Sequence, residues 1–264
     1  MKNKELAILL LSFFLVSATK PLMAKSLSVG WELWYPYQYH NAEQQLVGLD
    51  LEIFNAITKQ ANLNVEYTEL PWKRHLQYIK SGKMDVAMGA SKNSEREKYS
   101  YFTEPYRMET VKLFVLFGTS KQIPITSLKT LTNSDYMIGI ESGYYYGKEF
   151  QSLIKDTEFQ AHINDALDLE ENIALLFKGH IDGFLADPVT VKAFADKYNL
   201  HNEFEQHPLD IYQTGIHIML SKKATSMAML KRFNDAITTL NQSGEINTIL
   251  ERWNKIQSTG NFHF

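Results

Sequence analysis

The chain has 264 residues, enough for one large domain or for two smaller ones that each bury a hydrophobic core. Hydrophobic residues make up 44% of it and charged residues 22%, which is typical of a globular protein and excludes a disordered one. The formal net charge is -3, and lysine and arginine are scattered along the chain, which argues against nucleic acid and anionic membrane surfaces as partners.

The first 24 residues have the pattern of a secretory signal peptide. Lys2 and Lys4 precede an apolar run over residues 6–16, and small residues follow the run. The run is too short to span a membrane, because a spanning helix needs about 20 apolar residues. We expect cleavage after Ala18 or Ala24 and export of the mature chain.

The absence of cysteine bears on where the exported protein stays. Without cysteine there is no disulfide and no lipid anchor on an N-terminal cysteine. An unanchored exported protein would diffuse away from a cell with a single membrane. We therefore expect a periplasm between two membranes, as in Gram-negative bacteria.

Strands and helices alternate in the first part of the mature chain. The spacing of Leu49, Ile53 and Ile57 predicts an amphipathic helix, and Gly82 is placed to end the next helix. We expect strands over residues 27–30, 65–69 and 85–88, and helices over residues 48–61 and 73–79. This alternation favours a mostly parallel sheet with helices on its faces.

A pattern of helix, glycine and strand occurs once in each half of the chain. Gly82 precedes Asp85 by three residues, and Gly179 precedes Asp182 by the same spacing. This connection is common in α/β proteins, so the repeat alone is as compatible with coincidence as with two similar lobes.

Two long apolar strands are candidates for crossings between such lobes. They are expected over residues 110–117 and 211–220, and helices are expected over residues 227–240 and 245–253. The predicted division of the mature chain is lobe 1 over residues 25–117 plus 215–264, and lobe 2 over residues 118–214.

Charged residues of opposite sign follow the two repeated strands. Arg96 comes after the first strand and a small polar loop with Gly89 and Ser91, and Asp187 comes directly after the second strand. Ligands of α/β sheets bind beyond the carboxyl ends of strands. A guanidinium can hold a carboxylate and an aspartate can hold an ammonium, so the two residues could bind a zwitterion. Alternatively, Arg96 is a solvated helix residue and Asp187 a turn residue before proline.

Tryptophans occur at the corresponding ends of the first and third strands. Trp34 follows the first strand and Trp72 follows the third. Indole rings can cover the apolar part of a ligand or attract its ammonium group. Taken singly, each ring is equally compatible with a core position.

The sequence resembles the bacterial extracellular solute-binding proteins of family 3, the amino-acid-binding proteins of ABC-type importers. The resemblance runs from about residue 27 to residue 253 and is carried by Trp34-Tyr35-Pro36-Tyr37, Gly48 to Ile53, Gly82 to Asp85, Ser94-Glu95-Arg96, Phe102 to Tyr106, and Asp182 followed by Asp187. It implies an α/β fold of the periplasmic-binding-protein type II. This fold is a two-lobed clamp in which each lobe is a mostly parallel sheet flanked by helices, and two hinge crossings join the lobes.

The resemblance also assigns roles to individual residues. It implies that Arg96 holds the α-carboxylate of an amino acid and that Asp187 holds its α-amino group. It implies that Trp34 and Trp72 are two aromatic walls of the ligand site. It further implies that Ser91 and the backbone of Gly89 supply additional hydrogen bonds.

Two positions depart from the family pattern. At the mouth of lobe 2 the usual glycine followed by serine or threonine is replaced by Gly143-Tyr144-Tyr145, so that a phenol, with Tyr145 as a predicted ligand-binding residue, reshapes the pocket. Trp31 stands where some members that bind basic amino acids carry an acid. By the resemblance, this second departure argues against a cationic ligand side chain.

The resulting hypothesis is a monomeric periplasmic protein that captures a small polar ligand, expected to be an amino acid, by hinge closure. It passes the ligand to an inner-membrane permease and needs no cofactor, metal or catalytic residue. One alternative is a sensory module that docks on a receptor kinase. Another is an enzyme like the cyclohexadienyl dehydratases, with Glu32, Glu69 or Glu141 as general acid.

Overall fold

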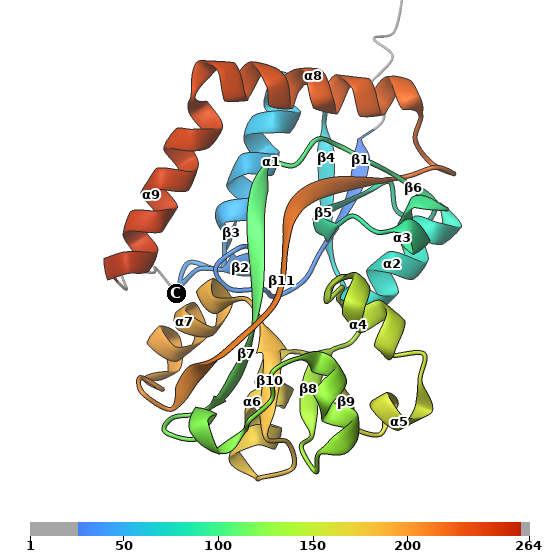
Figure 1. Cartoon of the computed structure of the whole chain (residues 1–264). Helices are drawn as coiled ribbons and strands as arrows, with labels where there is room; N and C mark the ends of the chain where they lie inside the picture. The colour runs from blue at the N-terminus through green and yellow to red at the C-terminus, as the bar shows by residue number, and fades with distance from the viewer. Residues whose placement is uncertain (1–25, 260–264) are drawn as a thin grey trace, which may run out of the picture.

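A computed structural model describes residues 26–259, so the predicted signal peptide lies outside the described residues. Two lobes, drawn one above the other in Figure 1, are joined by the long strands β7 (Arg107–Leu116) and β11 (Phe204–Ser221). Within residues 26–259, no helix has the length and apolar character needed to cross a membrane.

A mixed sheet of nine strands runs through both lobes. Its order is β4-β1-β5-β11-β7-β10-β8-β9, and β6 pairs with β11. In lobe 1, β1 (Leu27–Trp31) pairs in parallel with β4 (Val65–Glu69) and β5 (Val86–Ser91). In lobe 2, β8 (Ile138–Glu141) pairs in parallel with β9 (Ile163–Ala166) and β10 (Gly183–Ala186).

Every antiparallel pair of this sheet involves one of the two crossing strands. β7 pairs with β10 and β11, and β11 also pairs with β5 and with β6 (Ser100–Phe102). The sheet of each lobe is therefore mostly parallel, as predicted, and the antiparallel pairs are confined to the two crossing strands. The predicted lobe boundaries at residues 117 and 214 stay predictions.

Helices cover both faces of the lobe 1 sheet. Helix α1 (Leu49–Gln60) begins after Gly48, whose φ of 133° favours glycine, and packs with α8 (Met227–Ser243) and α9 (Glu245–Thr259). Helix α2 (Trp72–Ser81) lies on the opposite face. Val86 and Met88 of β5 pack into one of the two resulting cores and Ala87 packs into the other. After Gly89, whose φ is 72°, the alternation shifts, so Ala90 joins the core of Ala87.

Lobe 2 is built in the same way around its own two apolar clusters. One cluster lies under α4 (Gly147–Leu153) and α5 (Thr157–Gln160), and the other lies under α6 (Leu169–Phe177) and α7 (Pro188–Tyr198). The remaining short elements are α3 (Ser94–Glu97), β2 (Tyr39–His40), β3 (Leu46–Val47) and two 3-10 helices at Ser120–Gln122 and Leu128–Asn133.

The repeated glycine and aspartate have the same structural role in both lobes. Gly82 and Gly179 have φ values of 82° and 69°, a backbone conformation that glycine adopts without strain. The Asp85 carboxylate accepts from the backbone N–H of Ser28 at 2.8 Å, and the Asp182 carboxylate accepts from that of Met137 at 2.7 Å. Each aspartate thereby joins the start of its strand to the start of the neighbouring strand.

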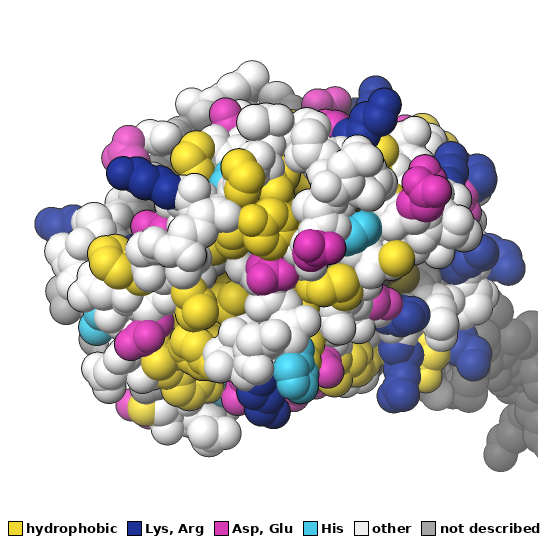
Figure 2. Space-filling view, turned by 60° about the horizontal axis from the view of Figure 1, so that its bottom comes forward, with side chains coloured by type: hydrophobic (Ala, Val, Ile, Leu, Met, Phe, Trp, Pro, Cys, Tyr) yellow, Lys and Arg dark blue, Asp and Glu magenta, His cyan; other side chains and the backbone are white. Residues whose placement is uncertain are grey.

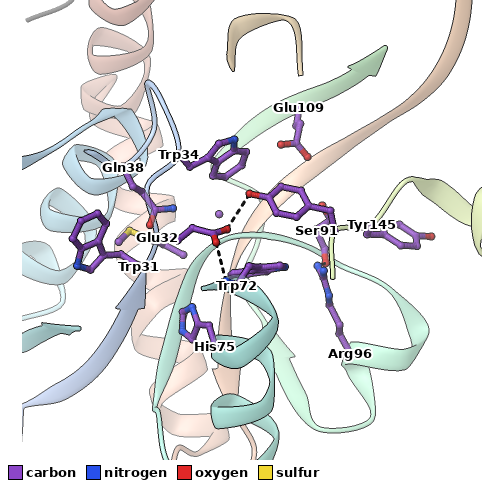
Figure 3. A pocket seen from close by; sticks show the side chains of 13 residues that line it. Trp31, Glu32, Trp34, Gln38, Trp72, His75, Ser91, Arg96, Glu109 and Tyr145 are labelled. Carbon is purple, nitrogen blue, oxygen red and sulfur yellow. Dashed lines mark hydrogen bonds between the residues drawn. The ribbon is translucent and has the colours of Figure 1, made fainter. Parts of the chain in front are cut away.

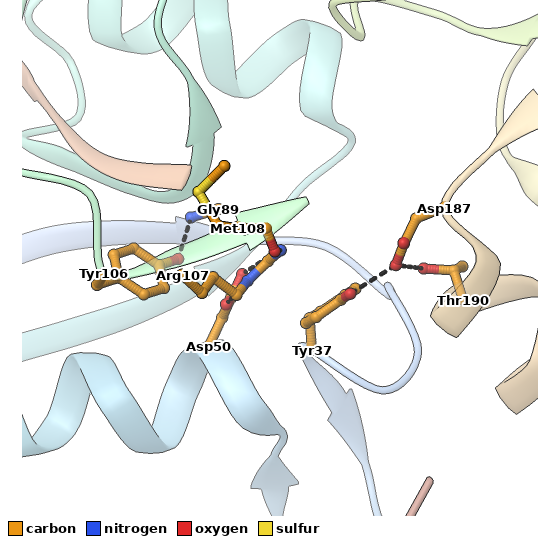
Figure 4. Close-up of polar contacts among 8 residues, drawn as sticks. All are labelled: Tyr37, Asp50, Gly89, Tyr106, Arg107, Met108, Asp187 and Thr190. Carbon is orange, nitrogen blue, oxygen red and sulfur yellow. Dashed lines mark hydrogen bonds and ion pairs between the residues drawn. The ribbon is translucent and has the colours of Figure 1, made fainter. Parts of the chain in front are cut away.

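A buried ion pair ties the start of α1 to the start of β7 (Figure 4). Arg107 donates from Nε and Nη2 to the two carboxylate oxygens of Asp50, at 2.6 and 2.9 Å. The two side chains are 2% and 0% exposed, which makes this a fully desolvated bidentate pair. The Arg107 guanidinium also lies 3.8 Å from the ring centroid of Tyr37.

The surface seen in Figure 2 mixes charge types. Hydrophobic and acidic side chains lie in the middle of this face, and lysine and arginine lie mostly around its edge. The continuous basic stripe that marks many nucleic-acid-binding surfaces is therefore not seen on this face.

We expect Asp50→Asn to lower the free energy of unfolding by about 3 to 5 kcal/mol, because it leaves the Arg107 cation buried without its counterion. Urea denaturation of the mature protein measures this change. The matched control is Asp235→Asn, which removes an exposed ion pair with Lys231 on α8 and should cost less than about 0.5 kcal/mol. Equal effects of the two substitutions would show that the buried pair does not hold the lobe together.

Candidate ligand-binding site

The predicted site residues converge between the two lobes (Figure 3). A small cavity there is lined by Trp34, Trp72, Gly89, Ser91, Arg96 and Tyr145, together with Glu32 and Glu109. Asp187 lines a second cavity, which shares Trp34, Glu109 and Tyr145 with the first. The structure thus brings all seven predicted residues to one interface, and their roles in binding stay predictions.

Arg96 is a buried cation at the lobe 1 side of the interface. Only 5% of it is exposed, which rules out the solvated helix position that the sequence left open. Its guanidinium donates from Nη1 to the carbonyl oxygen of Ser91 at 2.7 Å and from Nη2 to that of Gly143 at 2.8 Å. It also lies 5.4 Å from the ring centroid of Trp72. Burial lowers the pKa of Arg96 from its usual value.

Asp187 is a buried acid on the lobe 2 side of the interface. It immediately precedes α7, and it is 8% exposed. The hydroxyl of Tyr37 donates to its Oδ2 at 2.5 Å (Figure 4), and this hydrogen bond crosses from lobe 1 to lobe 2. Burial raises the pKa of Asp187, and the Tyr37 hydrogen bond opposes that rise.

The polar loop predicted at Gly89 and Ser91 is the end of strand β5 instead, because pairing with β11 continues to Ser91. The backbone N–H of Gly89 donates to the hydroxyl of Tyr106 at 2.9 Å and is thus occupied within the protein. A β-carbon at Gly89 would lie 2.9 Å from the Trp34 ring. Glycine at this position therefore lets Trp34 pack against the strand.

The space between the two tryptophans is taken by Tyr144 of lobe 2. Its ring centroid lies 5.9 Å from that of Trp34 and 6.3 Å from that of Trp72, and its hydroxyl donates to Glu32 at 3.0 Å (Figure 3). The cavity that remains has a volume of about 20 Å³, room for about one water molecule. In this arrangement the lobes are closed on each other, and Tyr144 would have to move before a ligand could lie between the two tryptophans.

Tyr145, the predicted phenol of the site, also lines the wide outer groove on one side of the interface. It packs edge-on against Tyr212 of β11, with ring centroids 5.2 Å apart. It is 7% exposed, and burial raises its pKa. Its neighbour Tyr144, and not Tyr145, lies between the tryptophans.

Two carboxyl groups of the first cavity have strongly perturbed acidity. Burial raises the pKa of Glu32 to about 7, although the hydrogen bonds from Trp72 and Tyr144 oppose the rise. Burial raises the pKa of Glu109 to about 8, although Arg107 opposes the rise. The structure records no hydrogen bond to the Glu109 carboxyl from residues 26–259.

Sequence reasoning missed Glu109. It named Tyr37 and Tyr144 within motifs near the pocket but did not include them among the predicted ligand-binding residues. Of the three acids considered for catalysis, Glu32 lines the first cavity and Glu141 lines the cavity of Asp187. Glu69 lines neither of these, but lines a separate hollow between the lobes together with Glu32. No group of three or more His, Cys, Asp or Glu in the described part of the chain is arranged to hold a metal ion.

Known proteins resemble the chain over most of its length. "ABC transporter arginine-binding protein 1" of Escherichia coli (strain K12) is 23% identical over 258 residues, which cover 96% of this chain and 99% of the relative. The "Arginine-binding periplasmic protein" of Mannheimia haemolytica is 23% identical over 222 residues, which cover 83% of this chain and 86% of the relative.

Solved structures confirm the predicted two-lobed fold. An ancestral arginine-binding protein bound to arginine has a TM-score of 0.73 at 22% identity, with 86% of this chain and 97% of that chain covered. A histidine kinase sensor domain with similarity to periplasmic binding proteins has a TM-score of 0.74 at 18% identity, with 87% and 96% covered.

The family profile described as bacterial extracellular solute-binding proteins, family 3, matches residues 27–256. This match spans both lobes, the two crossing strands and every predicted site residue. The chain therefore belongs to family 3 of the bacterial extracellular solute-binding proteins.

Proposed function

We propose that the ligand of this solute-binding protein is a free amino acid, held between the lobes by its zwitterionic head group. The observation that carries the proposal is the pair of buried opposite charges, Arg96 and Asp187, which face the interface from different lobes. A guanidinium is matched to an α-carboxylate and an aspartate to an α-ammonium. The curated relatives named above support an amino acid as ligand.

Internal groups occupy the positions that the ligand would take. The carbonyl oxygen of Gly143 is bound to Arg96 as an α-carboxylate oxygen would be, and the Tyr37 hydroxyl is bound to Asp187 as an ammonium would be. A zwitterion would replace these neutral partners by charged ones, and hydrogen bonds between two charged groups are stronger. The ligand would therefore stabilise a closed form in which it lies between Arg96 and Asp187.

The first test is thermal melting of the mature protein, unfolded and refolded to remove bound ligand, against a panel of amino acids and other metabolites. An amino acid at 100 times its dissociation constant should raise stability by about 2.7 kcal/mol. Asp187→Asn keeps the shape of the side chain but removes its charge, and should weaken binding about ten- to hundredfold.

The matched control for this substitution is Asp135→Asn, since Asp135 is exposed and lines none of the interface cavities. It should bind the amino acid as the wild type does. If no amino acid raises the melting temperature while another class of metabolite does, the zwitterion receptor is wrong. The same holds if Asp187→Asn and Asp135→Asn bind equally well.

A second prediction concerns Tyr144, which lies where the ligand would pack. We expect Tyr144→Ala to tighten binding of the same amino acid by a few-fold to about tenfold, because the ligand no longer competes with an internal group. Calorimetry measures the affinity, and small-angle scattering should show that the ligand-free variant is less compact than the wild type.

Tyr144→Phe separates the two contributions, because it removes only the hydrogen bond to Glu32 and keeps the ring. We expect an intermediate affinity for it. Weaker binding by Tyr144→Ala than by the wild type would contradict the idea of competition and would make Tyr144 a wall of the ligand site.

The proposed role of capture is delivery to an ABC-type permease of the inner membrane by a monomer in the periplasm. The likeness in fold to a histidine kinase sensor domain favours signalling as the second candidate, and both roles share the capture step. We further propose that the protein is no enzyme. Recovery of the unchanged amino acid after prolonged incubation would support this, and its conversion would overturn it.

A further inference from the structure

A third cavity adjoins the cavity that Asp187 lines. Its volume is about 70 Å³, and it shares Trp34, Glu141 and Thr190 with the cavity that Asp187 lines. Trp34 lines all three cavities. A ligand whose head group lies between Arg96 and Asp187 could therefore extend along the Trp34 ring into this third cavity.

Glu141 is a buried carboxyl that lines the third cavity and also the cavity that Asp187 lines. It ends strand β8 and is 7% exposed, yet the structure records no donor to its carboxyl oxygens from residues 26–259. Because Glu141 lines the cavity and accepts no hydrogen bond from these residues, a donor from outside the chain can bind its carboxyl. Burial, together with the nearby acids Glu32 and Asp168, raises the pKa of Glu141 well above its usual range.

The other walls of the cavity also favour a cation. Tyr35, Phe194 and Tyr198 contribute aromatic rings, and Asp168 and Glu170 add carboxylates at the rim. The rim already attracts an ammonium of the chain itself, since Lys197 Nζ lies 4.1 Å from the ring centroid of Tyr35 and 5.7 Å from that of Tyr198.

Two features oppose a cation at this place. One is the Lys197 ammonium at the rim, and the other is the end of a helix. The positive N-terminus of helix α6 borders the cavity at Leu169. Two acidic side chains offset it, because Asp168 accepts from the backbone N–H of Glu171 at 2.8 Å and Glu170 lies in the first turn of the helix. Asp168 and Glu170 thus leave carboxylates beside the cavity, and Glu141 adds a carboxyl whose charged form a bound cation would stabilise.

We propose that the third cavity is a subsite for a cation, in which Glu141 receives the guanidinium or ammonium group at the end of the ligand side chain. The protein then selects basic amino acids, an inference that rests on the proposed capture of an amino acid. The sequence argued against a cationic side chain from one position, Trp31. In the structure the carboxyl that would bind the cation is that of Glu141 in lobe 2, which lines the third cavity.

The test compares L-arginine with L-citrulline, which has nearly the same shape but a neutral urea group in place of the guanidinium. Calorimetry on the refolded mature protein should give an affinity for arginine about ten- to hundredfold higher than for citrulline. Glu141→Gln should remove most of this preference by weakening arginine binding, with citrulline binding little changed.

Glu158→Gln is the matched control, because Glu158 is an exposed glutamate of lobe 2 outside the cavities, and it should keep the wild-type preference. Glutamine has the shape of a protonated glutamate, so the Glu141→Gln variant is expected to fold, and its melting temperature without ligand checks this.

The outcomes separate the two proposals. If the wild type binds citrulline as tightly as arginine, or if Glu141→Gln keeps the wild-type preference, the cation subsite is wrong while capture of an amino acid stands. If neither of these nor any other α-amino acid binds, the proposed function itself fails.

Discussion

The buried pair of Asp50 and Arg107 is the interaction on which the geometry of the site depends. It joins the first turn of α1 to the first residue of β7, the strand that leads into lobe 2. The Arg107 guanidinium lies 3.8 Å from the ring centroid of Tyr37 and 5.2 Å from that of Trp34. The loop that carries Trp34 and Tyr37 therefore packs against this cation. A pair with both charges out of water tolerates little displacement, because an unpaired charge there would cost several kcal/mol. The pair thus fixes the loop, the helix and the crossing strand relative to one another.

Hydrogen bonds between the lobes hold them closed, and a ligand can replace the neutral partner in some of these bonds. Three hydrogen bonds that cross the interface lie at the predicted site, and each has a charged or titratable side chain on one side and a neutral group on the other: Arg96 to Gly143, Tyr37 to Asp187, and Tyr144 to Glu32. Lys73 also donates across the interface to Ser142, and Lys197 donates to Tyr35. A hydrogen bond to a charged group is worth about 1.5 to 3 kcal/mol, and these bonds offset the burial of those groups when no ligand is bound. A zwitterion gains affinity only by the amount by which its own contacts exceed those of the internal partners.

The alternation of strands and helices and the two glycine and aspartate connections could be predicted from the sequence. Both depend on the preferences of residues that are close together in the chain. Arg96 and Asp187 were found because they follow strands that end at the interface. Glu109 was missed although a signal existed. Glu109 lies on the same buried face of β7 as Val111 and Leu113, where a charged residue is unexpected. The place of Tyr144 could not be predicted, since it depends on how a loop of one lobe meets the other lobe.

Among the acidic residues of the interface, those whose carboxyl accepts no recorded hydrogen bond from residues 26–259 say most about the charge of the ligand. Asp187 and Glu32 each accept a hydrogen bond from a tyrosine of the other lobe, so their burial is compensated without any ligand. Glu109 and Glu141 are 8% and 7% exposed and receive no recorded donor from residues 26–259. Both line the cavity that Asp187 also lines. A protein whose solute carried no positively charged group would bury these two carboxyls at a cost in stability with no return in affinity. For a cationic solute the same two carboxyls become charged hydrogen-bond acceptors, and the cost of burying them is offset when the ligand binds.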